Sequence, residues 1–137
     1  MADMFSKKRR SEIMSKIRSK NTGAERLVFR HLRAKGLHFQ KHYKGAPGSP
    51  DIALPKKKLA VFIDGDFWHG RHLNRLLVKG TKNYWVMKIT TNIKRDRRQR
   101  AALKKGGWKI LKVWESDLKR VSTRYDQLLK VEKFIKN

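Results

Sequence analysis

One short apolar run limits what this chain can fold into. Leu59–Ile63 is a stretch of five consecutive apolar residues, which is typical of a strand buried on both faces of a sheet. No longer apolar run occurs, and this one falls far short of the roughly 20 residues that a membrane-spanning helix needs. Two acids follow directly, in Asp64-Gly65-Asp66. The sequence therefore predicts a central strand that ends in carboxylates.

Further elements are expected on either side of this strand. Thr22-Gly23-Ala24-Glu25 has the pattern of a capping box that opens a helix, and Gly36 would end that helix. The remaining patterns predict strands at Leu37–Tyr43, 51–54 and Trp108–Trp114, a helix at 83–105, and a final helix with Val121, Tyr125, Leu128 and Ile135 on one face. We expect a single α/β domain over residues 22–137, with a small central mixed sheet flanked by helices.

The charge of the chain indicates what kind of partner it has. Lys and Arg number 36 against 11 Asp and Glu, which gives a formal net charge of +25. Self-repulsion at this level destabilises a small fold, so a polyanionic partner such as nucleic acid is the natural explanation. A solubilising surface and a membrane-surface binder are the alternatives. Residues 1–21 are expected to form a basic N-terminal arm or helix that contacts DNA.

Two absences bear on the cellular compartment. The chain has no cysteine, which excludes disulfides, thiolate metal ligands and thiol nucleophiles. No N-terminal segment joins a basic stretch to a long apolar one, so we expect no secretion signal and a cytoplasmic protein.

Four acids fall where predicted elements begin or end: Glu25, Asp51, Asp64 and Asp66. Adjacent strands that each end in an aspartate would place like charges a few ångströms apart, and Mg²⁺, which prefers hard oxygen ligands, would relieve the repulsion. His69, five residues after Asp64, could take a proton from an activated water or stabilise a leaving oxygen. Such a group of acids in a basic protein favours a metal-dependent phosphodiesterase that acts on nucleic acid.

Each candidate also has a purely structural interpretation. Glu25 could serve only the capping box, Asp51 could cap a turn, and Asp66 could be a turn residue beside Gly65. The aromatic pair Phe67 and Trp68 could wedge between bases, as could Met14 in the basic arm, or these side chains could pack in the core. The other histidines receive no role from their spacing, which does not fit a zinc site: His31, His38, His42 and His72.

A family resemblance rests on motifs spread over residues 5–118. The motifs are Arg10–Ile17, Pro47–Asp51, Val61–Gly70, Tyr84–Ile89, Arg95–Arg98 and Gly107–Glu115. In this order they resemble the very short patch repair (Vsr) endonucleases, bacterial enzymes that nick DNA at T:G mismatches left by deamination of 5-methylcytosine. The resemblance implies a restriction-endonuclease-like fold related to the PD-(D/E)xK nucleases.

The resemblance also implies roles at the acid cluster. Asp51 holds one or two Mg²⁺ ions, the backbone carbonyl of Ile63 is a further ligand, Glu25 acts through metal-bound water, and His69 assists catalysis. The best-known members have a histidine where this chain has Asp64. Asp64 is therefore expected to bind the metal directly, as the second acid of related nucleases does.

DNA contacts follow from the same resemblance. Phe67 and Trp68 match aromatic residues that intercalate beside the mismatch, and Met14 matches a methionine that enters from the opposite groove. The residues expected to contact DNA from the helix at 83–105 are Trp85, Lys88, Asn92 and Arg95.

One metal site of the best-known members has no counterpart here. They have a cysteine where this chain has Asp66, and Arg71, Leu73 and Ser116 stand in the region that holds their structural zinc, so no structural zinc is expected. We expect a nucleoid-associated monomer that acts on mismatched duplex DNA, with mismatch-repair proteins as further partners. The alternatives are a Vsr-like homing or site-specific endonuclease and, outside enzymes, an architectural DNA-binding protein.

Overall fold

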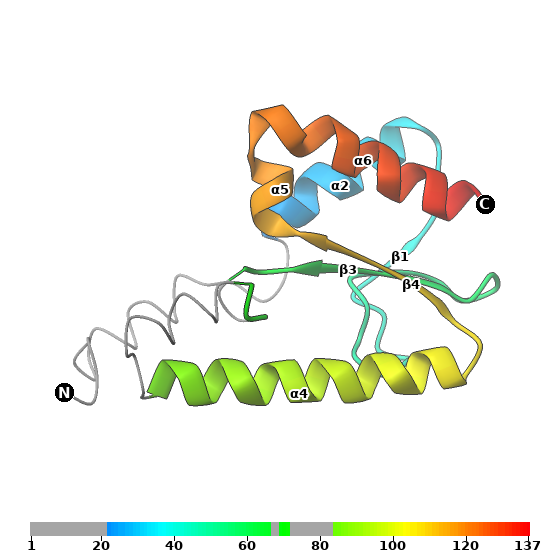
Figure 1. The fold of residues 1–137 in the computed structure, drawn as a ribbon. Helices are drawn as coiled ribbons and strands as arrows, with labels where there is room; N and C mark the ends of the chain where they lie inside the picture. Colours follow the sequence, from blue (N-terminus) through cyan, green and yellow to red (C-terminus); the bar gives the residue numbers. More distant parts are fainter. Residues whose placement is uncertain (1–21, 67–68, 72–83) are drawn as a thin grey trace.

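The structure, a computed structural model, describes residues 22–66, 69–71 and 84–137. In chain order its elements are α2 (Gly23–Ala34), β1 (Gln40–Lys41), β2 (Ile52–Leu54), β3 (Leu59–Asp64), α4 (Tyr84–Lys105), β4 (Lys109–Trp114), α5 (Glu115–Lys119) and α6 (Val121–Lys136). The predicted α/β class, a small mixed sheet flanked by helices, is confirmed (Figure 1).

The sheet has the strand order β1-β2-β3-β4. The first two pairings are antiparallel, whereas β3 and β4 are parallel, with Ile63 opposite Val113 and Asp64 opposite Trp114. A parallel pair needs a crossover connection, and α4 lies within the one between β3 and β4. In Figure 1, α4 runs along one face of the sheet while α2, α5 and α6 cover the other.

Strand β3 is buried along its whole length, as the continuous apolar run predicts. Alternate side chains of a strand point to opposite faces, so Val61 and Ile63 join the core beneath α2, α5 and α6. Ala60 and Phe62 join a second, smaller core that includes Leu103 of α4. Because both faces of β3 are covered, its last residue, Asp64, is also held inside the protein with 2% of its surface exposed.

Helix α2 begins as the capping box predicts. The Glu25 backbone N–H donates to Thr22 Oγ1 at 3.2 Å, and the Thr22 N–H donates to Glu25 Oε1 at 3.3 Å. The helix ends before Gly36, whose φ of 73° lies in the left-handed region that glycine tolerates. This cap fixes the position of the Glu25 carboxylate at the buried end of the helix.

Helix α4 is a polar rod of 22 residues. Only Trp85, Ile89, Asn92 and Leu103 are buried in it, and most of its Lys and Arg side chains are exposed. Among the described segments, no helix combines the length and the apolar character needed to cross a bilayer.

Two sequence expectations differ from the structure. The strand expected at Leu37–Tyr43 is only the pair Gln40–Lys41, because the next residue, His42, takes a positive φ of 47° that ends the extended backbone. The expected C-terminal helix is two helices, and Val121 and Tyr125 are 82% and 63% exposed rather than part of the core. Both lie in the first two turns of α6, where no residue is buried, so the packed face begins only in the second half of that helix.

Two valines of α6 provide a matched test of this packing. Val131 is fully buried, so Val131→Ala is expected to lower the free energy of unfolding by roughly 2 kcal/mol, the sum of two lost methyl groups and the cavity they leave. The same substitution at the exposed Val121 is expected to change it by less than about 0.5 kcal/mol. Urea unfolding followed by circular dichroism measures both. Equal losses would contradict the assignment of the packed face.

Candidate functional site

Antiparallel pairing of β2 with β3 brings the start of one strand beside the end of the other. Asp51 directly precedes β2, and its Oδ2 accepts a hydrogen bond of 2.7 Å from the backbone N–H of Ile63. Asp64 follows Ile63 as the last residue of β3. The two aspartates that the sequence placed at strand ends therefore lie on neighbouring strands at one edge of a cavity that both line.

Glu25 joins this edge from α2. Its side chain is 2% exposed, and its Oε1 lies 3.1 Å from the Nε2 of His42 while also accepting from the Thr22 backbone. One ligand atom each of Glu25, His42 and Asp51 lies within 4.8 Å of the other two. Glu25 therefore closes the capping box and also belongs to the acid cluster, while its role at a metal stays a prediction.

His42 is a member of the cluster that the sequence did not single out. It lies just after β1, and its backbone N–H donates to the carbonyl of Asp51 at 2.9 Å. Its neighbours come from β2 and α2, so only the tertiary fold brings it to Glu25. No spacing pattern in the sequence could have identified it.

The clustering changes the acidity of Asp51. Burial, together with the nearby negative charges of Glu25 and Asp64, raises the pKa of Asp51 well above the ordinary value for an aspartate, although the Ile63 N–H opposes the rise. A carboxylate in this setting is stabilised by a nearby cation, because the cation offsets both the lost hydration and the repulsion.

A second group of charged side chains surrounds Asp64. Arg100 of α4 donates to Asp64 Oδ1 at 2.7 Å and lies over the ring of Phe62 at 4.2 Å. His69 Nδ1 lies 3.8 Å from the same oxygen and is hydrogen-bonded to Asp96 of α4. The other oxygen, Asp64 Oδ2, is buried without a hydrogen-bond partner among the residues that the structure describes.

The pairing of His69 with Asp96 sets the chemistry of both groups. Burial opposes ionisation of Asp96, but its hydrogen bond to His69 and the nearby charges of Arg100 and Arg95 outweigh it and lower the pKa of Asp96 below its ordinary value. Because Nδ1 of His69 is engaged, Nε2 is the ring nitrogen left to exchange a proton with a substrate. Sequence patterns assign no role to Asp96 or to Arg100, since their partners lie 27 and 36 residues away along the chain.

One cavity of about 600 Å³ unites these groups. Most of the predicted site residues within the described ranges line it: Glu25, Asp51, Ile63, Asp64, His69, Lys88, Asn92 and Arg95. Trp85 is the exception, since it is 2% exposed and packs edge-on against Tyr84 rather than lining the cavity. The predictions for Met14, Phe67 and Trp68 lie outside the described residues.

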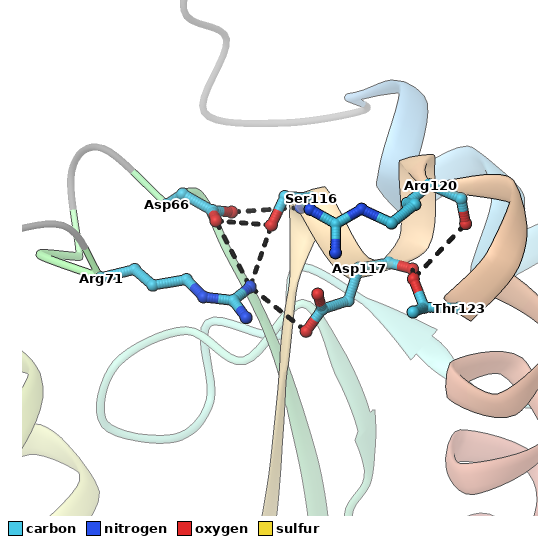
Figure 2. Close-up of polar contacts among 6 residues, drawn as sticks. All are labelled: Asp66, Arg71, Ser116, Asp117, Arg120 and Thr123. Atoms are coloured by element: carbon cyan, nitrogen blue, oxygen red, sulfur yellow. Dashed lines mark hydrogen bonds and ion pairs between the residues drawn. The ribbon is translucent and has the colours of Figure 1, made fainter.

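The turn that carries His69 is tied to the start of α5 by a polar network (Figure 2). Asp66 accepts from the backbone N–H of Ser116 at 3.1 Å and from its hydroxyl. Arg71 donates to that hydroxyl at 2.9 Å, lies 3.4 Å from Asp66 and pairs with Asp117 at 3.2 Å.

This network includes Arg71 and Ser116, two positions in the region where the resemblance places a structural zinc. The third position, Leu73, lies outside the described residues. The Asp66 carboxylate is hydrogen-bonded within this network, which agrees with its interpretation as a turn residue.

Buried carboxylates beside a His–Asp pair, in a cavity flanked by a helix rich in Lys and Arg, are what a metal-dependent nuclease would need. Comparison with known proteins specifies the family. A family model described as DNA mismatch endonuclease Vsr matches residues 2–75. The type II nicking enzyme V.XorIIP of Xanthomonas oryzae pv. oryzae is 42% identical over 120 residues, which is 86% of this chain and 88% of that protein.

Two further relatives also align over most of this chain and most of their own length. The type II nicking enzyme V.NmeAIP of Neisseria meningitidis is 38% identical over 138 residues, covering 100% of this chain and 99% of its own. The DNA mismatch endonuclease Vsr of Escherichia coli is 34% identical over 130 residues, or 94% and 83% of the two chains. The chain belongs to the Vsr endonuclease family and is a DNA endonuclease, which sets aside the interpretation as an architectural protein.

The network around Asp66 generates a stability prediction. Asp66→Ala leaves the Ser116 N–H without its acceptor and removes one of the three partners of the Arg71 guanidinium, and we expect it to lower the free energy of unfolding by about 1–3 kcal/mol. Asp126→Ala, at an exposed acid of α6, serves as the control and is expected to change it by less than about 0.5 kcal/mol. Urea unfolding measures both, and equal stabilities of the two variants would show that the network does not hold the turn.

Proposed function

We propose that this endonuclease nicks one strand of duplex DNA at or beside a T:G mismatch and that it uses Mg²⁺. The observation that carries the proposal is the convergence of Asp51, Asp64, Glu25 and His69 on one cavity beside the basic helix α4. The names of the relatives support its finer parts: one is a DNA mismatch endonuclease, and others are nicking enzymes. A single site would cut a single strand, so we take a monomer as the acting unit.

The residues present fit a hard divalent cation. Asp51 carries a raised pKa that a cation would reverse, and Asp64 has a buried oxygen without a hydrogen-bond partner in the described part of the chain. We assign Asp51, Asp64 and the carbonyl of Ile63 to the metal and Glu25 to water at its edge. When bound, Mg²⁺ would offset charge on the phosphoryl oxygens and increase the acidity of water.

The residues of the chain do the remaining work. His42 and the Thr22 N–H hold Glu25 at one orientation through the same oxygen, Oε1. His69, fixed by Asp96, accepts through Nε2 the proton of the water that attacks phosphorus, while the bond from phosphorus to the leaving sugar oxygen breaks. The proton that the leaving oxygen needs comes from solvent.

DNA contacts are assigned to the rim of the same cavity. Lys88, Asn92 and Arg95 of α4 line it and would hold the strand near the acids. Met14, Phe67 and Trp68 would open the base stack, at a cost of a few kcal/mol that a mispaired step reduces.

The proposal is tested with two duplexes of identical sequence that differ only in one T:G pair. We expect Mg²⁺-dependent nicking of one strand of the mismatched duplex, little nicking of the paired one, and no nicking in EDTA. Asp51→Asn should abolish nicking while binding is retained. His69→Ala should lower the rate by about 10²- to 10⁴-fold, whereas His38→Ala, at an exposed histidine, should leave it unchanged.

Each other outcome removes a defined part of the proposal. Equal cleavage of both duplexes would support the alternative, a site-specific endonuclease of the same family. Full activity in EDTA would exclude the metal, and a normal rate for His69→Ala would exclude the proton transfer.

A further inference from the structure

A second depression, of about 400 Å³, adjoins the candidate site. Four polar residues line both hollows and form the wall between them: Asp64, His69, Asp96 and Arg100. The rest of its lining is Ile93, Arg97, Ala101 and Lys104 of α4 and Lys112 of β4. A linear polymer that is bound in the first hollow and reaches His69 therefore has the second hollow directly beside it.

The second depression is positively charged. Both of its carboxylates already have partners, since Asp64 pairs with Arg100 and Asp96 with His69. Arg97, Lys104 and Lys112 are exposed, and none of them forms an ion pair with an acid in the described part of the chain. Arg97 and Lys104 therefore contribute uncompensated charge to the hollow, and Lys112, whose Nζ lies 4.2 Å from the centre of the Trp114 ring, adds a third cation that no described acid neutralises.

The lining also indicates what kind of anion fits. Its one ring is the imidazole of His69, which is already hydrogen-bonded to Asp96, and its described residues include no Asn or Gln amide that could read a base edge. Its only aliphatic lining residues in the described part of the chain are Ile93 and Ala101. Exposed Arg and Lys side chains supply most contacts to the phosphate backbone, which position a nucleic acid without reading its sequence.

We propose that Arg97, Lys104 and Lys112 form a flanking-phosphate site, which binds a backbone phosphate next to the scissile one on the cleaved strand. This inference rests on the proposed function. Successive phosphates of one strand follow at about 3.4 Å of helix axis, so a strand whose scissile phosphate lies at the acid cluster must place its neighbours within reach of the adjoining hollow. Binding there sets the register of the strand relative to His69 and the acids.

The test combines charge removal on the DNA with charge removal on the protein. A single neutral methylphosphonate linkage is moved along the cleaved strand, and the affinity of each duplex is measured for the wild type, Lys104→Ala and Lys112→Ala. The matched controls are Lys105→Ala, next in sequence on α4, and Lys109→Ala on β4, because both lysines are exposed and line neither hollow.

We expect one linkage beside the scissile phosphate to weaken binding by the wild type and by both controls about tenfold, and to weaken binding by Lys104→Ala and Lys112→Ala clearly less, because each of these variants has already lost one contact to that phosphate. Each of these two variants should also lower the slope of log affinity against log salt by about 0.9, the loss of one phosphate contact. The controls should keep the wild-type dependence on the neutral linkage. Circular dichroism confirms that all four variants fold.

The remaining outcomes overturn the inference in distinguishable ways. If Lys104→Ala and Lys112→Ala stay as sensitive to every neutral linkage as the wild type, the flanking-phosphate site is wrong even though the enzyme nicks DNA. If inorganic phosphate competes only in the wild type while the linkage profile is unchanged in the variants, the hollow takes a free anion instead. If the wild type binds DNA but nicks no duplex, the proposed function fails, while the binding data still decide the site. If the wild type binds no duplex, both fail.

Discussion

The site depends on the burial of like charges. Asp51 directly precedes β2, Asp64 ends the neighbouring strand β3, and Glu25 reaches them from α2. Burial, together with the proximity of these acids, raises the pKa of Asp51 well above its ordinary value. The fold imposes this arrangement through the pairing of β2 with β3 and through the capping box of α2. Hydrogen bonds offset only part of the cost, so the cluster is a place where a divalent cation gains more than it would at the surface.

Charge is divided between two groups on either side of Asp64. On one side, the carboxylates of Asp51 and Glu25 are held by backbone N–H groups and His42. On the other, Arg100 neutralises Asp64, and Asp96 fixes His69. The first group suits a metal and the second suits proton transfer, and the hollow next to the second group is lined by further cations. A strand of DNA would meet both groups and this hollow in succession.

Local features of the site were predictable because they depend on near neighbours in the sequence. The apolar run of β3, the capping box and the acids at strand ends all follow from periodicity and local hydrogen bonding. His42, Asp96 and Arg100 were not predictable, because each acquires its role from partners on other elements. The packing of α6 was not predictable either, because the spacing of apolar residues cannot show that the first two turns of the helix extend past the core.

Burial and the neighbouring acids disfavour the ionised form of Asp51, and a bound cation would stabilise that form. Because the folded state binds a proton at Asp51 more tightly than the unfolded chain does, wild-type stability falls as pH rises from the ordinary aspartate range through the raised pKa. Thermal unfolding of the wild type and Asp51→Asn, in EDTA and in Mg²⁺, tests this directly. In EDTA we expect Asp51→Asn to be more stable than the wild type at about pH 8 and to lose that advantage at about pH 4. Addition of Mg²⁺ should stabilise the wild type and leave the stability of Asp51→Asn unchanged. A less stable Asp51→Asn at about pH 8, or an equal response of both proteins to Mg²⁺, would contradict the account.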